Sequence, residues 1–107
     1  MPRWRWRFRK LGRGRPPSDI FLYSLPPVRR FVPYPSKGQP IELSYGEYEV
    51  IRLLDLEELT HEEAAKRMNT SRATVWRLAK SARKKIAQAL TESRPIVIKP
   101  KGELEKV

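Results

Sequence analysis

The sequence predicts an all-α fold: a three-helical core containing a helix-turn-helix pair, with an extended Pro-rich N-terminal arm and a short C-terminal strand. Apolar residues recur at three- and four-residue spacing between residues 45 and 90, which is the periodicity of amphipathic helices. Helix-capping residues divide that stretch at Ser44, Thr60 and Ser71. Seven prolines between residues 12 and 40 exclude a regular helix there. The core is therefore expected in the middle of the chain.

The 107 residues divide into four segments. Only 39% of the chain is apolar, so a core is expected in the helical segment alone. We expect a basic arm that is disordered in the free protein, a Pro-rich extended segment that wraps the core, the helix-turn-helix domain, and a short strand with a tail. These segments cover, in that order, residues 1–15, 16–43, 44–93 and 94–107.

The arm alternates arginine with aromatic residues, reading RWRWRFRK from residue 3 to residue 10. If the arm is extended, this period of two puts the arginines on one face and the rings on the other. The alternation also suits an anionic membrane surface, but no apolar run in the chain approaches the length of a transmembrane helix. We expect no membrane partner. On nucleic acid the arm can follow phosphates or a minor groove, through Arg3, Arg5, Arg7, Arg9, Lys10, Arg13 and Arg15.

The first helix is expected from residue 45 to about residue 58. Ser44 and Glu47 have the spacing of a capping box. The helix should bury Tyr48, Ile51 and either Leu53 or Leu54. Its opposite face is acidic and is expected to be either solvated or a docking face for a basic partner such as RNA polymerase; it carries Glu47, Glu49, Asp55, Glu57 and Glu58.

The next two helices form the helix-turn-helix pair. Thr60 and Glu63 make a second capping box at the start of the first of them. Asn69 falls where that helix must end in a left-handed residue, which Asn tolerates. Ser71 then caps the last helix, which is expected over residues 72–91. A short helix, a tight turn and a basic second helix are the plan of a DNA-reading motif.

The last helix has an apolar and a basic stripe. The apolar stripe comprises Val75, Leu78, Ala79, Ala82, Ile86, Ala89 and Leu90. The opposite stripe comprises Ala73, Arg77, Lys80 and Lys84. Trp76 lies on the flank beside Arg83, and we interpret it as structural, either covering the core or stacking under Arg72, Lys80 or Arg83.

The first two turns of this helix are expected in the major groove of double-stranded DNA. Arg72 and Arg77 have the fork geometry that recognises guanine, and small or hydroxyl side chains can contact thymine methyls or phosphates. The candidate base-edge contacts are Ser71, Arg72, Ala73, Thr74 and Arg77. The residues farther along are expected to contact phosphate, which positions the protein without specifying sequence; they are Lys80, Arg83 and Lys84.

The flanking segments carry short extended elements. Residues 96–98 are β-branched and are predicted to pair either with residues 41–43 or with residues 30–32. The run around Phe31 and Tyr34 is expected to form a short strand or to clamp these two rings against the helices.

The distribution of charge points to a nucleic-acid partner. Residues 1–40 carry ten basic side chains and one acidic, a net +9, whereas residues 41–71 carry three basic and eight acidic, a net −5. Residues 72–93 carry six basic and one acidic, a net +5. Basic charge is therefore gathered on the arm and the last helix, apart from an acidic body.

The composition argues against an enzyme. The chain has no cysteine and one histidine, His61, so we expect no disulfide, metal site or cofactor. It also has no paired acid and base and no Gly-rich phosphate loop. We expect a cytoplasmic, nucleoid-associated protein without catalytic residues.

The EAA…M..SR pattern of residues 63–72 resembles the helix-turn-helix of region 4 in bacterial sigma factors. The chain more closely resembles the small prokaryotic proteins grouped as domain of unknown function 134. That likeness covers residues 13–98: the GRP-and-Arg segment, the Pro-rich stretch, the helical run of residues 48–90 and the apolar RPIVI tail.

The resemblance implies a sigma-region-4-like helical domain that binds DNA, with no catalytic residues to carry over. Asn69 stands where a glycine is common in the pattern. The RWRWRFRK arm lies before the shared region, so the resemblance implies no role for it.

The prediction is therefore a sequence-specific DNA-binding transcriptional regulator. One helix reads only a few base pairs, so two copies are expected to form a homodimer through the C-terminal half of the last helix. The first alternative is an RNA-binding or ribosome-associated protein that uses the arginine and aromatic residues of the arm. The second is a module that docks on polymerase through the acidic helix.

Overall fold

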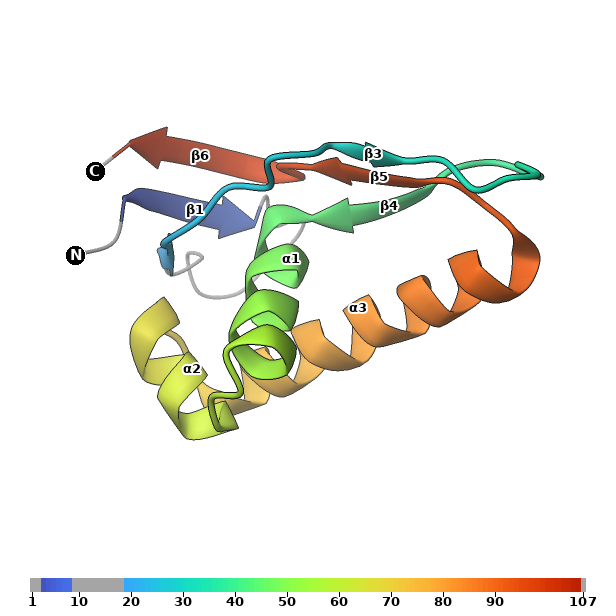
Figure 1. Cartoon of the computed structure of the whole chain (residues 1–107). Coiled ribbons are helices and arrows are strands. Elements are labelled where there is room, and N and C mark those ends of the chain that lie inside the picture. The colour runs from blue at the N-terminus through green and yellow to red at the C-terminus, as the bar shows by residue number, and fades with distance from the viewer. Residues whose placement is uncertain (1–2, 9–18, 107) are drawn as a thin grey trace, which may run out of the picture.

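The computed structural model describes residues 3–8 and 19–106, and its fold is mixed α/β rather than all-α (Figure 1). Two three-stranded sheets accompany the predicted helices, so the predicted fold class is wrong. In chain order the elements are β1 (Trp4–Phe8), β2 (Ile20–Leu22), β3 (Arg30–Phe31), β4 (Ile41–Ser44), α1 (Tyr45–Ile51), the π-helical turn η1 (Arg52–Leu56), α2 (His61–Met68), α3 (Arg72–Glu92), β5 (Ile96–Lys99) and β6 (Gly102–Lys106).

The first sheet joins the two ends of the chain in the order β2-β1-β6, with both pairings antiparallel. Trp4 lies opposite Leu22 on one side and Lys106 on the other. Trp6 is fully buried, and its indole Nε1 donates a hydrogen bond of 2.6 Å to the carbonyl of Pro100. Burial of this ring offsets the entropy lost when the arm is ordered.

The expectation of a disordered arm is therefore wrong for residues 4–8. The predicted alternation is confirmed there, because Trp6 faces the core while Arg5 and Arg7 lie on the other face. Of the rest of the predicted arm, Arg3 is described, whereas residues 1–2 and 9–15 lie outside the described residues.

The second sheet has the order β3-β5-β4. Strand β5 is central, pairing in parallel with β4 through Ile41 and Ile96 and antiparallel with β3 through Arg30 and Val97. Both of the alternative pairings predicted for residues 96–98 therefore occur together. The strand at residues 30–31 is also confirmed, but the predicted aromatic clamp is wrong, because Phe31 and Tyr34 are exposed.

The first helix begins where predicted and ends near the predicted position. Ser44 and Glu47 form the capping box: the Glu47 N–H donates to Ser44 Oγ at 3.1 Å, and the Ser44 N–H donates to Glu47 Oε1 at 2.8 Å. Helix α1 then continues into η1, which the sequence did not predict. Leu53 and Leu54 are both buried, whereas Tyr48 and Ile51 are half-buried.

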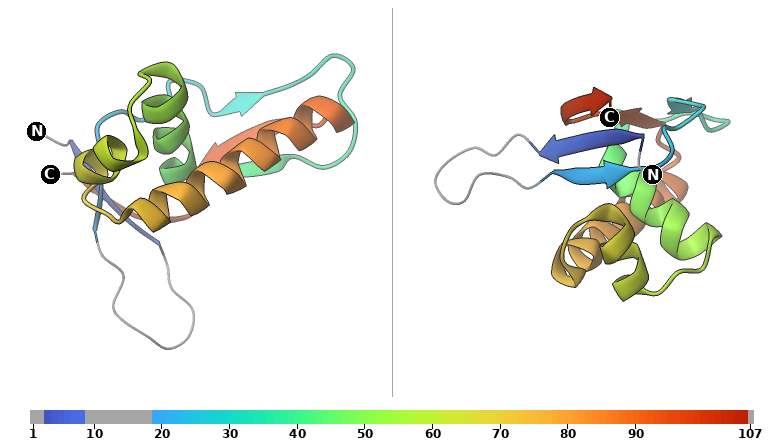
Figure 2. Two further views of the ribbon diagram at one scale, coloured as in Figure 1. Left: turned by 90° about the horizontal axis from the view of Figure 1, so that it is seen from below. Right: turned by 90° about the vertical axis from the view of Figure 1, so that its left-hand side faces the viewer.

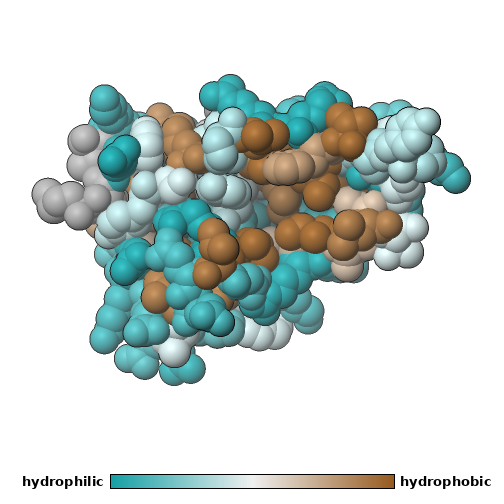
Figure 3. Space-filling view, in the orientation of Figure 1, coloured by the Kyte–Doolittle hydropathy of each residue, from teal (hydrophilic) through white to brown (hydrophobic). Residues whose placement is uncertain are grey.

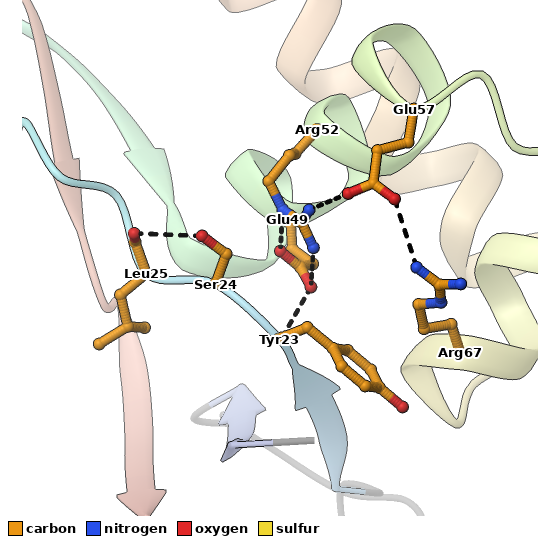
Figure 4. A network of polar contacts seen from close by, with 7 residues as sticks. All are labelled: Tyr23, Ser24, Leu25, Glu49, Arg52, Glu57 and Arg67. Atoms are coloured by element: carbon orange, nitrogen blue, oxygen red, sulfur yellow. Dashed lines mark hydrogen bonds and ion pairs between the residues drawn. The ribbon is translucent and has the colours of Figure 1, made fainter. Parts of the chain in front are cut away.

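The acidic face of this helix is divided: Glu47 and Glu49 are buried, whereas Asp55, Glu57 and Glu58 are exposed. The predicted exposure is therefore wrong for Glu47 and Glu49 only. Glu49 is fully buried and accepts hydrogen bonds from the Tyr23 N–H at 2.8 Å and from Arg52 Nε at 2.9 Å (Figure 4). Glu57 binds Arg52 and, at 3.3 Å, Arg67 of α2. These carboxylates tie α1, η1 and α2 to the segment after β2.

The two sheets lie on one side of the helices (Figures 1 and 2). The hydrophobic core lies between the sheets and the helices. Its fully buried members include Trp6 and Leu22 of the first sheet and Leu53, Met68 and Val75 of the helical layer. Helix α3 runs the length of this helical layer, so its start and its end lie in different surroundings (Figure 1).

Candidate nucleic-acid interface

The helix-turn-helix pair has the predicted local geometry. The Glu63 N–H donates to Thr60 Oγ1 at 3.1 Å, and the Thr60 N–H donates to Glu63 Oε1 at 2.8 Å. Asn69 ends α2 in the left-handed conformation, with φ 57° and ψ 46°. Ala64 and Ala65 are buried where α2 packs against α3. The turn therefore fixes the direction in which α3 leaves α2.

The start of α3 is held by two hydroxyl groups. The Thr74 N–H donates to Ser71 Oγ at 3.0 Å, and Ser71 Oγ lies 3.0 Å from Thr74 Oγ1. Ser71 thus serves the helix cap, as predicted. If Ser71 donates to Thr74, the Thr74 hydroxyl keeps its own hydrogen for an external acceptor. Thr74 is half-buried, so the exposed members of the candidate base-edge set are Ser71, Arg72, Ala73 and Arg77.

The predicted basic stripe of α3 is exposed along its whole length, at Ala73, Arg77, Lys80 and Lys84. Within residues 3–8 and 19–106, Arg72, Arg77 and Lys84 form no ion pair with a carboxylate. Their charge is therefore available to an external anion.

Trp76 stacks against Lys80, whose Nζ lies 4.9 Å from the centroid of the ring. This confirms one of the predicted stacking partners. The alternative, that Trp76 covers the core, is wrong because the residue is 53% exposed. A cation–π contact of this kind directs the lysine along the helix surface.

Arg83 differs from the other cations of α3 because a carboxylate already holds it. Its Nη2 lies 2.7 Å from Asp55 Oδ1 and its Nε lies 3.2 Å from Asp55 Oδ2. The hydrogen bond to Asp55 raises the pKa of Arg83. This fork joins η1 to α3, so a phosphate contact by Arg83 would have to compete with Asp55.

Two arginines of β1 are held in the same way. Arg7 Nη2 lies 2.6 Å from Asp19 Oδ1, and that hydrogen bond raises the pKa of Arg7. Arg5 binds Glu105 at 2.8 Å. Arg3 is exposed. The other candidate phosphate contacts of the arm lie outside the described residues: Arg9, Lys10, Arg13 and Arg15.

A partly buried polar cluster joins α1 to the middle of α3. Glu47 accepts hydrogen bonds from Ser81 and Lys85 of α3 in addition to the Ser44 N–H. Burial opposes the ionisation of Glu47, but these hydrogen bonds outweigh it and lower the pKa of the carboxyl group. The cluster fixes how α3 is rotated against α1.

Three residues near the exposed stripe were not among the predicted contacts. Lys85 and Lys101 line the same hollow as Arg77, and His61 lines a second hollow with Arg72. The sequence could have predicted that His61 lies near the start of α3, because His61 begins α2 and that end of α2 lies beside the start of α3. The position of Lys101 depends on the sheet, which sequence periodicity did not predict.

In the described part of the chain, no group of three or more His, Asp or Glu side chains could hold a metal ion. Among the same described residues, no helix is long and apolar enough to cross a membrane.

The fold and this surface define a class: small α/β proteins in which a helix-turn-helix pair presents an exposed basic helix. The chain belongs to the family described as "Protein of unknown function DUF134", whose sequence model matches residues 1–107. The match includes the RWRWRFRK segment, so the expectation that this arm lies outside the shared region is wrong.

Two relatives cover nearly the whole chain, and a third covers almost three quarters of it. A UPF0251 protein of Archaeoglobus fulgidus is 46% identical over 104 residues, which are 96% of this chain and 98% of the relative. A UPF0251 protein of Pyrococcus furiosus is 46% identical over 106 residues, 95% and 92% of the two chains. One of Pyrococcus horikoshii is 53% identical over 81 residues, 72% and 74% of the two chains. No solved structure matches the chain, so the resemblance to sigma region 4 stays a prediction.

Proposed function

We propose that this protein is a sequence-specific DNA-binding regulator of transcription that inserts the first two turns of α3 into the major groove. One observation carries the proposal. Arg72 and Arg77 are exposed at the start of the second helix of a helix-turn-helix pair and have no carboxylate partner among the described residues, whereas Arg5, Arg7 and Arg83 are each held by one.

The side chains divide into two kinds of contact. Arg72 and Arg77 can each present two N–H groups to guanine O6 and N7, and a good bidentate pair of this kind discriminates against the wrong base by about 1–3 kcal/mol. Ala73 and the methyl group of Thr74 suit a thymine methyl. Lys80 and Lys84 lie farther along the exposed stripe and suit phosphates.

The N-terminal segment contributes differently from the sequence prediction. Trp6 is buried and has no face for a base, so β1 offers less to single-stranded RNA than its sequence suggested. Arg5 and Arg7 stabilise the first sheet through Glu105 and Asp19. The four basic residues between residues 9 and 15 remain proposed phosphate contacts. A regulator of this kind acts on the nucleoid, in the cytoplasm.

The test is selection of bound sequences from a random duplex pool by the full chain. We expect one enriched motif for the wild type and none for the double variant Arg72→Ala/Arg77→Ala. The double variant Lys99→Ala/Lys106→Ala removes the same charge from the sheets and should select the wild-type motif. If the wild type enriches no motif, or if both double variants lose it equally, the proposal is wrong.

A further inference from the structure

A continuous strip of apolar side chains crosses one face of the molecule. Eight large apolar side chains are exposed among the described residues, and six of them line three hollows that have lining residues in common. We call these six the apolar strip: Val28, Phe31, Val32, Tyr34, Leu56 and Leu90. Figure 3 shows apolar residues gathered between the second sheet and the C-terminal half of α3. Apolar patches as continuous as this mark interaction sites more often than ordinary surface.

The middle of the strip excludes a charged partner. The central hollow has a volume of about 400 Å³ and is lined without any charged side chain. Its walls come from α1, from α3, from all three strands of the second sheet and from the segment before β3. They include Ile51 of α1, Ile86 of α3 and Ile96 of β5. A phosphate backbone placed here would lose its hydration without gaining a cation. The strip therefore suits an apolar protein surface.

The strip and the basic stripe lie on different sides of α3. Lys84 of the stripe and Ile86 of the central hollow are two residues apart, which places them about 160° apart around a helix of 3.6 residues per turn. A partner on the strip leaves the basic stripe free.

The length of α3 indicates which partner fits. Ile86 follows Thr74, the middle of the candidate base-edge set, by a rise of about 18 Å at 1.5 Å per residue. Two copies related by a two-fold axis at the central hollow, with their α3 helices antiparallel, put the two base-reading segments about 36 Å apart. One turn of B-DNA, the spacing of half-sites read by helix-turn-helix dimers, is about 34–36 Å.

The two ends of the strip carry opposite charges. Glu58 follows Leu56 at one end, and Lys37, whose N–H donates to the Ser93 carbonyl at 2.7 Å, lies at the other. Both are exposed, and neither forms an ion pair with another described residue. A two-fold axis through the middle brings the acidic end of one copy to the basic end of the other.

We propose that a second copy of this chain covers the apolar strip, forming a two-fold symmetric dimer that presents two recognition helices to adjacent major grooves. The half-site spacing depends on the proposed function. The dimer itself depends only on the strip.

The oligomeric state of the full chain tests the dimer. Sedimentation should give twice the chain mass of 12.6 kDa for the wild type, and Leu90→Glu should give the single-chain mass. Leu90 is 78% exposed, so the variant should keep the wild-type circular dichroism spectrum and melting temperature. Val32→Glu on β3 is a second variant with the same expected result. Leu104→Glu introduces the same charge on β6, away from the strip, and should remain dimeric.

A wild type that is monomeric both alone and on DNA would overturn the dimer. So would a Leu90→Glu variant that sediments like Leu104→Glu, or a monomer that retains an apolar small molecule in native mass spectrometry.

DNA selection separates this proposal from the function. The wild-type dimer should enrich an inverted repeat with half-site centres about ten base pairs apart, and monomeric Leu90→Glu should enrich one half-site only. A dimer that enriches no sequence contradicts the proposed function and supports the dimer. A monomeric wild type that enriches a single half-site contradicts the dimer and supports the function.

Discussion

At the scale of single residues, arginines of similar sequence context have two different roles. Arg83 and Arg7 are held in forks by Asp55 and Asp19, whereas Arg72 and Arg77 extend from α3 without a carboxylate partner in the described chain. The sequence predicted all four as contacts to DNA. It could not separate them, because their partners lie elsewhere in the chain and are brought close only by the fold.

Because of this difference, alanine at Arg77 should affect DNA binding, whereas alanine at Arg83 should affect folding stability. Arg77→Ala should weaken binding to the selected duplex by about 1–3 kcal/mol and relax one base position, with unchanged stability. Arg83→Ala should leave the preferred sequence unchanged and lower the free energy of unfolding by about 0.5 kcal/mol, because its ion pair is half exposed. Fluorescence anisotropy and urea unfolding measure the two effects. An equal loss on all duplexes for Arg77→Ala would make it a phosphate contact.

Glu47 makes stability depend on pH. Its pKa in the folded protein is lowered from the ordinary value of 4.5, so the ionised carboxylate stabilises the fold above that pH. The stabilisation should disappear as the pH falls from about 4.5 through the lower folded-state pKa. Urea unfolding across this range should show a smaller pH dependence for Glu47→Gln than for the wild type. Identical slopes in the two proteins would contradict the role given to the Glu47–Ser81–Lys85 cluster.

At the scale of elements, the sequence predicted the helices well and the sheets poorly. Helix boundaries depend on local signals, and Ser44, Thr60 and Ser71 cap helices where those signals indicated. The strands are two to five residues long and pair across the chain, as Trp6 of β1 does with Leu104 of β6. No local periodicity marks such a pairing, so the first sheet was not predicted, and the second was predicted only through the β-branched residues 96–98 and their pairing with residues 41–43 or 30–32.

The burial of Glu49 was also not predicted, because it depends on a segment distant in the sequence. Helical periodicity assigns Glu49 to the polar face of α1 and therefore predicts that it is exposed. The segment after β2 crosses that face and supplies the Tyr23 N–H, which satisfies the carboxylate inside the protein. A prediction from one helix alone cannot anticipate this covering segment.

The turn between α2 and α3 depends on one left-handed residue. Asn69 has φ 57°, where a residue with a Cβ atom costs about 1–2 kcal/mol unless it is Asn or Asp, and where Gly, which lacks a Cβ atom, fits without that cost. Asn69→Ala should therefore lower the free energy of unfolding by about 1 kcal/mol, and Asn69→Gly should remain close to the wild type. Thermal unfolding followed by circular dichroism measures both. Equal destabilisation by Ala and Gly would instead assign the effect to the hydrogen bond that Asn69 Nδ2 donates to the Asp19 carbonyl.

At the scale of the whole molecule, the N-terminal strand holds the sheets and helices together. Trp6 of β1 packs against the start of α1, where a Cβ atom on Gly46 would lie 2.5 Å from the ring. The segment that the sequence marked as a free basic arm is thus partly a structural element, and the charge segregation seen in the sequence is reduced by Asp19 and Glu105.

Gly46→Ala should therefore destabilise the protein by overpacking Trp6, by about 1–3 kcal/mol. A smaller side chain at position 6 should relieve the clash. Gly46→Ala should therefore lower the free energy of unfolding less in a Trp6→Leu background than in the wild type. A double-mutant cycle of urea unfolding measures this coupling. Additive effects of the two substitutions would show that β1 does not pack on α1.

The central claim is that the start of α3 reads DNA sequence. The most direct test is anisotropy titration of the full chain on its selected duplex and on a scrambled duplex at one salt concentration. The account predicts binding to the selected duplex at least about a thousandfold tighter, as for specific DNA-binding proteins, with the preference reduced by Arg77→Ala. Equal affinity for the two duplexes would contradict it.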